Sequence, residues 1–134
     1  TRNYPGSDPV KLIIDRQHRI NVNDHPSFQG DYLYFSYQKR RNIPGENQYI
    51  ISRDSELESI LHEVMKSQIN SVIIEGGSKI IRSFYNQGLW DEARVITTPN
   101  VLEEGIKAVN VEGNLINEYY IDNDLVQIIK NPLS

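Results

Sequence analysis

The most constraining feature of the sequence is a short apolar run that ends in two adjacent glycines and leads into an amphipathic segment. Residues 71–75 read SVIIE, Gly76 and Gly77 follow, and apolar residues then recur at helical spacing after Ser78. A continuous apolar run of this length is typical of a strand that is covered on both faces. The stretch therefore predicts a strand, a glycine turn and a helix, which is a unit of α/β proteins.

The rest of the chain alternates strands and helices around this unit. The expected strands are residues 10–15, 32–37, 49–52, 71–75, 91–98, 115–121 and 125–130, with a short extension at 19–22, and the expected helices are residues 55–68 and 78–87. We therefore predict an α/β fold with a mostly parallel mixed sheet, flanking helices and a C-terminal antiparallel hairpin.

Local signals set the ends of several of these elements. An apolar stripe defines the first helix and consists of Leu57, Ile60, Leu61, Val64 and Met65. Ser55 and Glu58 have the spacing of a capping box at its start. Gly88 is expected to end the second helix, and Asp122-Asn123 suits a tight hairpin turn.

Composition excludes several classes of protein. The 134 residues include no cysteine, so thiolate metal sites, disulfide scaffolds and cysteine nucleophiles are ruled out. No apolar run approaches the roughly 20 residues that span a bilayer. A formal net charge of -4 argues against non-specific nucleic-acid binding. The three histidines lack metal-ligand spacing, so we expect no metal site.

The glycine pair supports two interpretations that the local sequence leaves open. A backbone without Cβ can approach a phosphate closely and adopt positive φ, and a helix start offers N–H groups to an anion. Ser78 would add a hydroxyl and Lys79 a charge, while Glu75 would be the nearest carboxylate. Alternatively, Gly76 and Gly77 form only a tight connector. The pattern is neither a Walker A loop nor the three-glycine dinucleotide fingerprint.

A second candidate is the basic triplet Lys39-Arg40-Arg41, which follows an expected strand. It could reach an anionic group such as a nucleotide 2′-phosphate, although such triplets are more often solvated loops. No serine lies in a nucleophile elbow. No catalytic residue can be assigned from these patterns.

Two runs resemble the riboflavin-biosynthesis reductase family, the reductase domain of the bifunctional pyrimidine deaminase/reductase, whose fold resembles dihydrofolate reductase. Residues 72–99 resemble the family's segment of Glu-Gly-Gly, helix, Asp-Glu, strand and Thr/Ala-Pro. Thr1-Arg2, Asp8-Pro9 and residues 10–20 (VKLIIDRQHRI) resemble its opening run. The resemblance covers nearly the whole chain in the same order.

The resemblance implies a cytoplasmic enzyme that reduces 5-amino-6-(5-phosphoribosylamino)uracil with NADPH, and a homodimer that has no membrane or nucleic-acid partner. Arg2 and Glu75 would contact this small phosphoribosyl-pyrimidine substrate, and Arg16 would lie near the cofactor. The residues expected to hold the cofactor pyrophosphate are Gly76, Gly77, Ser78, Lys79, Ile80, Ile81, Arg82 and Ser83.

The chain also departs from the family pattern. The region before the arginine motif and the zinc deaminase half are absent, so residues 1–134 would form one N-terminally truncated reductase domain that is weakly active or inactive alone. Two alternatives stay open. One is a non-catalytic assembly or ligand-sensing module of the same fold, and the other is a different pterin or pyrimidine reductase of dihydrofolate-reductase-like fold.

Overall fold

The computed structural model describes residue 6 and residues 8–134, and the chain divides into two compact units at the boundary between Ser71 and Val72. We describe each unit by itself. Within the described residues, no helix is long and apolar enough to cross a membrane.

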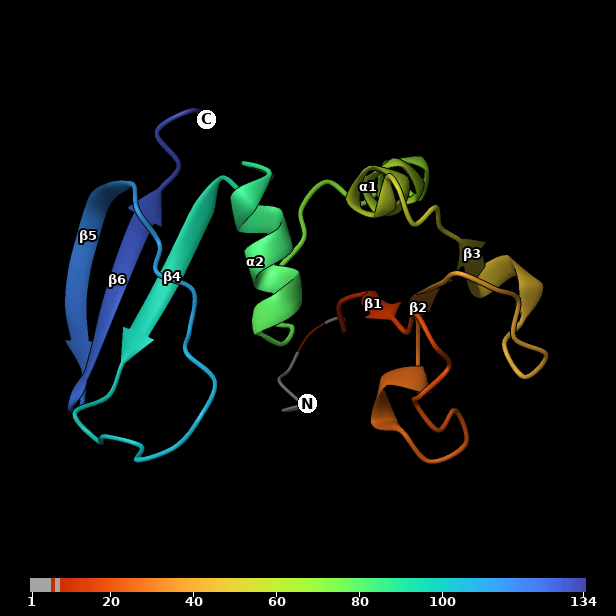
Figure 1. The fold of residues 1–134 in the computed structure, drawn as a ribbon, viewed down its shortest axis with the longest axis horizontal. Coiled ribbons are helices and arrows are strands. Elements are labelled where there is room, and N and C mark those ends of the chain that lie inside the picture. Colours follow the sequence, from red (N-terminus) through yellow and green to blue (C-terminus); the bar gives the residue numbers. More distant parts are fainter. Residues whose placement is uncertain (1–5, 7) are drawn as a thin grey trace. The chain divides into compact units, whose positions relative to one another are not determined.

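The first unit contains a three-stranded parallel sheet and one α-helix (Figure 1, red to yellow-green). The strands lie in the order β1-β2-β3, and β2 pairs in parallel with both neighbours. The elements of this unit are β1 (Lys11–Ile14), η1 (Pro26–Phe28), β2 (Tyr32–Ser36), η2 (Gly45–Asn47), β3 (Gln48–Ile50) and α1 (Glu56–Lys66). The expected extension at residues 19–22 is wrong, because these residues belong to no strand.

The core of the first unit is centred on the aromatic strand β2. Tyr34 and Phe35 are completely buried, and Tyr34 clusters with Ile13 and Ile43. The Phe35 ring stacks on Tyr49 at 5.5 Å between ring centroids. Burial of these large rings on both faces of β2 explains why the run of residues 32–36 forms the central strand of the sheet.

Helix α1 buries most of its expected stripe. Leu57, Ile60 and Val64 are buried and Leu61 is half-buried, whereas Met65 is 74% exposed. Met65 was therefore wrongly included in the stripe. The buried positions repeat at three and four residues, and Met65 follows Val64 directly, which turns its side chain about 100° away from the buried line.

The start of α1 differs from the sequence prediction, which expected a capping box there. The capping box is not formed, since the Ser55 side chain makes no capping hydrogen bond and Glu58 is exposed. Ser55 has ψ of 50°, outside the extended geometry that aims an N-cap side chain at the first turn. At the other end Gln68 adopts φ of 58°, and the N–H of Ile69 donates to the Val64 carbonyl. These contacts form a left-handed helix stop.

The second unit contains one helix and a three-stranded antiparallel sheet (Figure 1, green to blue). Its elements are α2 (Ser78–Asn86), β4 (Glu92–Thr97), β5 (Asn114–Ile121) and β6 (Asp124–Lys130), and the strand order is β4-β6-β5. The predicted hairpin is confirmed, because Asp122-Asn123 alone connects β5 to β6 and Asp122 has φ of 51°.

Polar and aromatic contacts attach the end of α2 to the strands of its own unit. Gly88 has φ of 68° and follows the end of the helix, as predicted. The Asn131 side-chain amide donates to the carbonyls of Gly88 and Trp90, and the Trp90 ring lies 5.7 Å from the Tyr85 ring. These contacts fix the direction in which the chain leaves α2 and enters β4.

The predicted strand at residues 71–75 is wrong, because these residues join neither sheet. Ile73 is 84% exposed, although its apolar neighbours led to the expectation of a covered strand. An apolar pattern alone does not make a strand, since each strand needs ladder bonds to a neighbouring strand. The α/β class holds, with a parallel sheet, helices and an antiparallel sheet, but the strands form two sheets instead of one mixed sheet.

Candidate functional site

The first candidate site is the start of helix α2. Gly77 is the N-cap, so no side chain caps the N–H groups of the first turn. The Gly77 carbonyl accepts hydrogen bonds from the N–H of Ile80 at 3.0 Å and of Ile81 at 3.4 Å. The N-terminus of a helix carries partial positive charge and free N–H groups, which together favour an anion.

The two glycines at this helix start have different physical roles. A Cβ on Gly76 would lie 2.1 Å from Cγ2 of Ile80, so Gly76 is needed for the close packing of the first helical turn. A Cβ on Gly77 would meet nothing within 4 Å. Neither glycine uses the positive φ that we expected, and Gly77 has φ of -61°. Gly76 therefore acts as a tight connector, while Gly77 leaves open space above the helix start.

The charged side chains around this helix start are exposed, whereas Ser78, Ile80, Ile81 and Ser83 are half-buried. Glu75, Lys79 and Arg82 are exposed, and the Ser83 hydroxyl donates to the Lys79 carbonyl within the helix. One carboxylate therefore precedes the helix, and two cations lie in its first two turns, near the uncapped helix start. All the sequence-predicted residues from Glu75 to Ser83 lie together in the second unit.

Two predicted residues lie elsewhere. Arg2 lies outside the described residues, and Arg16 belongs to the first unit. Arg16 follows β1, at the carboxyl edge of the parallel sheet. This edge is where open α/β sheets bind ligands.

Sequence reasoning missed the residues that surround Arg16. The Arg16 guanidinium donates to both carboxylate oxygens of Glu56, at 2.7 Å from Nε and 2.5 Å from Nη2. The Tyr37 hydroxyl donates to the same carboxylate, and the Arg53 guanidinium lies 4.3 Å above the centre of the Tyr37 ring. Their place in the sequence could have indicated this cluster, because Arg16, Tyr37 and Arg53 all follow the carboxyl ends of parallel strands.

The electrostatics of this cluster follow from its hydrogen bonds. The Arg16 hydrogen bonds hold the pKa of Glu56 below its ordinary value, even though partial burial opposes this shift. The hydrogen bond to Glu56 raises the pKa of Tyr37 and that of Arg16. Glu56 is therefore an anion that is held by one cation and one phenol hydroxyl.

A second polar network lies beside it and accounts for the basic triplet. The buried carboxylate of Asp15 accepts from the Tyr34 hydroxyl and from Nη1 of Arg40, both at 3.1 Å. Burial is the main cause that raises the pKa of Tyr34. Arg40 is thus engaged inside the unit, whereas Lys39 and Arg41 are exposed. Of the three, only Lys39 and Arg41 have the solvated-loop character that we considered as the alternative.

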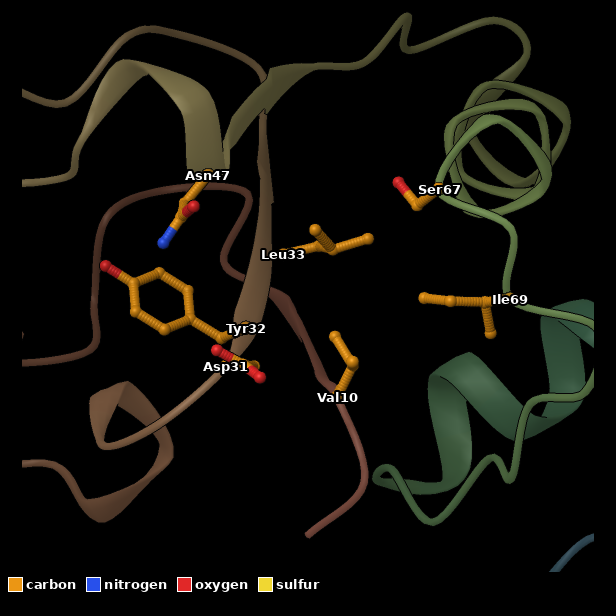
Figure 2. Close-up of a pocket in the computed structure, with 7 residues that line it drawn as sticks. All are labelled: Val10, Asp31, Tyr32, Leu33, Asn47, Ser67 and Ile69. Atoms are coloured by element: carbon orange, nitrogen blue, oxygen red, sulfur yellow. The ribbon is translucent and has the colours of Figure 1, made fainter. Parts of the chain in front are cut away.

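A cavity of about 250 Å³ lies at the opposite, amino edge of the same parallel sheet. Figure 2 shows Leu33 and Ile69 pointing toward one another across it, with Val10 nearby. Polar lining comes from Asp31, Asn47 and Ser67, and Tyr32 completes the set. Ligand pockets usually have about 300–1,000 Å³, and none of the sequence-predicted site residues lines this cavity, so we assign it no role.

The parallel sheet, the helices and the antiparallel sheet define an α/β protein of the dihydrofolate-reductase-like class. The chain belongs to the RibD C-terminal domain family, whose model matches residues 1–128. Among solved structures, it is similar to the diaminohydroxyphosphoribosylaminopyrimidine deaminase/5-amino-6-(5-phosphoribosylamino)uracil reductase of Thermotoga maritima. The TM-score is 0.81 and the identity 21%, over 97% of this chain and 40% of that chain. A structure of Acinetobacter baumannii RibD gives a TM-score of 0.73 and 20% identity, over 91% and 37%.

Curated relatives agree with the family match. The riboflavin biosynthesis protein RibD of Haemophilus influenzae is 25% identical over 105 residues, which are 75% of this chain and 28% of that protein. The protein of the same name from Aquifex aeolicus is 23% identical over 104 residues, 73% of this chain and 29% of that protein. The chain thus spans less than a third of the length of these relatives.

Proposed function

We propose that this chain is part of the reductase domain of a riboflavin-biosynthesis enzyme that reduces 5-amino-6-(5-phosphoribosylamino)uracil to the ribitylamino compound. The match of the RibD C-terminal domain model to residues 1–128 carries this proposal. The names of the matched relatives support it, since the Thermotoga maritima protein is described as a reductase of this substrate.

The proposed cofactor is NADPH, and the helix start fits a dinucleotide pyrophosphate. Gly77 leaves open space there and supplies no side-chain cap, so the backbone N–H groups of Ser78 and Lys79, which precede the first hydrogen-bonded N–H at Ile80, are available to phosphate oxygens. The exposed cations of Lys79 and Arg82 add positive charge. Ser78 would contribute its backbone N–H and its hydroxyl, and Ile80, Ile81 and Ser83 are the further proposed cofactor-binding residues along the same two turns. When bound, the reduced nicotinamide supplies the hydride that C1 of the opened ribose accepts.

The proposed substrate contacts are Glu75 and Arg2. The exposed carboxylate of Glu75 precedes the glycines and can accept hydrogen bonds from substrate N–H or O–H groups. A guanidinium such as that of Arg2 suits a phosphate, with which it can form paired hydrogen bonds. No proton donor is assigned to these residues, so their proposed contribution is to bind the substrate and orient the sugar carbon.

Further parts of the proposal concern the cofactor preference, oligomeric state, domain extent and cellular location of the enzyme. We propose a preference for NADPH over NADH, a homodimer, one partial reductase domain over residues 1–134, and a cytoplasmic location. These parts rest on the family and on the small phosphorylated substrate that it implies.

The decisive experiment is a fluorescence titration of NADPH against the chain and two variants at Gly77. Gly77→Asp and Gly77→Asn have nearly the same shape, and both residues are good N-caps, so both variants should fold. Only the aspartate adds a negative charge next to the proposed pyrophosphate. We expect Gly77→Asp to weaken NADPH binding about tenfold relative to Gly77→Asn, which corresponds to about 1.4 kcal/mol.

Equal affinity of the two variants for NADPH would contradict the site at the helix start. Absence of NADPH binding by the unsubstituted chain would contradict the cofactor assignment. Circular dichroism of all three proteins controls for folding.

A further inference from the structure

The cluster around Arg16 has a geometry that a simple surface ion pair does not need. Glu56 is the first residue of α1, and its side chain is 12% exposed, whereas that of Arg16 is 36% exposed. The more buried partner is therefore the carboxylate. It contacts the guanidinium through both oxygens, which fixes the plane of the guanidinium as well as its distance.

The carboxylate of Glu56 is itself held in place. The Tyr37 hydroxyl donates to Oε2, the same oxygen that accepts from Nε of Arg16. The first turn of a helix favours a negative charge, and Glu56 occupies its first position. The Glu56 carboxylate is thus held by Tyr37, which follows β2, and by the start of α1. The exposed part of Arg16 lies at the edge of the sheet.

Arg53 adds a second guanidinium to this edge. It lies over the face of the Tyr37 ring at 4.3 Å, which is a cation–π arrangement. One guanidinium therefore lies over the Tyr37 ring, and a second shares the Glu56 carboxylate with the Tyr37 hydroxyl, at the carboxyl edge of the parallel sheet. This combination suits a phosphate group better than a neutral ligand.

We propose that Glu56 is a positioning residue that sets the orientation of the Arg16 guanidinium toward a phosphate group of the dinucleotide. This inference rests on the proposed function, because it takes Arg16 as a cofactor contact. Glu56 does not touch the phosphate in this role. It acts through Arg16, whose remaining N–H groups are then held in a fixed plane.

The sign of the effect separates positioning from simple electrostatics. Removal of a nearby negative charge should strengthen the binding of an anion if charge alone matters. If positioning matters, the same removal should weaken binding, because Arg16 loses the partner that holds its plane. The comparison of Glu56→Ala with Glu56→Gln therefore tests the proposal directly, since the glutamine oxygen can still accept from Arg16.

The experiment measures NADPH and NADH dissociation constants for the unsubstituted chain and its variants. We expect Glu56→Ala to weaken NADPH binding at least about fivefold and Glu56→Gln to stay within about twofold, differences of about 1 and 0.4 kcal/mol. Glu58→Ala is the matched control, because Glu58 lies in the same first turn but is exposed. We expect no change from it. A loss that is larger for NADPH than for NADH identifies the phosphate that only NADPH carries.

A double-mutant cycle ties the effect to Arg16. In an Arg16→Ala background, Glu56→Ala should cause no further loss of NADPH affinity. Tighter or unchanged NADPH binding by Glu56→Ala, or a full loss that persists without Arg16, would overturn the proposal. A purely structural role of Glu56 would produce that persistent loss together with a lower melting temperature.

A measurement without cofactor distinguishes failure of this inference from failure of the proposed function. The Nε–H signal of Arg16 in nuclear magnetic resonance should exchange slowly with water in the unsubstituted chain and rapidly in Glu56→Ala. Equal exchange in both proteins would overturn the positioning by Glu56. Slow exchange that depends on Glu56, in a chain that binds no NADPH, would instead contradict the proposed function and remove the cofactor from this inference.

Discussion

Arg40 and Asp15 form an ion pair inside the first unit, with 3.1 Å between Nη1 of Arg40 and Oδ2 of Asp15. The Asp15 side chain is 4% exposed and also accepts hydrogen bonds from the backbone N–H groups of Arg19 and Ile20. One carboxylate thus joins the end of β1, the following turn and the loop after β2. Its neutralisation would leave Arg40 partly buried without its partner.

The first prediction concerns this carboxylate. Asp15→Asn should lower the free energy of unfolding by about 3 kcal/mol, because an amide supplies one acceptor oxygen and leaves the Arg40 charge uncompensated. Urea denaturation measures the change. Lys39→Gln serves as the control, since Lys39 is exposed and should shift stability by less than about 0.5 kcal/mol. A loss below about 1 kcal/mol for Asp15→Asn would show that the network contributes little.

The second prediction concerns the glycine that precedes α2. Gly76→Ala should destabilise the second unit by about 1–3 kcal/mol, because its Cβ would overlap with Cγ2 of Ile80 at 2.1 Å. In an Ile80→Ala background that Cγ2 is absent, so the additional cost of Gly76→Ala should largely disappear. Thermal unfolding of the four proteins measures this coupling. Independent, additive effects would contradict the close contact.

The third prediction concerns pH. The pKa of Glu56 is lowered in the folded chain, mainly by hydrogen bonds from Arg16. A lowered pKa means that the ionised carboxylate contributes stability above its unfolded pKa of about 4.3, and that this contribution is lost as pH falls through the folded pKa. Unsubstituted chain and Glu56→Gln should therefore differ by about 1–2 kcal/mol near neutral pH and converge in acid. Urea denaturation between about pH 7 and pH 3 tests this, and a constant difference would contradict it.

The fourth prediction concerns the end of α1. Gln68 has φ of 58°, a left-handed conformation that glycine adopts without steric cost. Gln68→Gly should therefore raise the free energy of unfolding by about 0.5–1 kcal/mol. Gln87→Gly is the matched comparison, because Gln87 has φ of -92° and should gain nothing. Denaturation midpoints of both variants decide whether backbone strain at Gln68 is real.

The sequence predicted best where local physics decides the structure. The helix of residues 78–86, its stop at Gly88 and the hairpin at Asp122-Asn123 depend on neighbouring residues and are confirmed. Residues 71–75 have an equally clear pattern, yet they form no strand, because a strand requires a partner that the pattern cannot supply.

The candidate site likewise has one part that the local sequence predicts and one part that only the fold brings together. The uncapped helix start after Gly77 follows from the sequence, since the motif is contiguous. The Glu56 anchor of Arg16 could not be found, because the two residues lie 40 positions apart and meet only through the fold. Position at the carboxyl ends of parallel strands was the available clue, and it identifies Tyr37 and Arg53 as well.

Homologous sequences should conserve Gly76 and Gly77 to different degrees. A residue that replaces Gly76 must be accommodated by a change at Ile80. Substitutions at these two positions should therefore occur together. A side chain at Gly77 would meet no neighbouring atom, so packing does not require glycine there. Only binding of a ligand at the helix start would select for it. A lineage that lost the ligand would therefore keep Gly76 and be free to replace Gly77, which makes the second glycine the better marker of a working site.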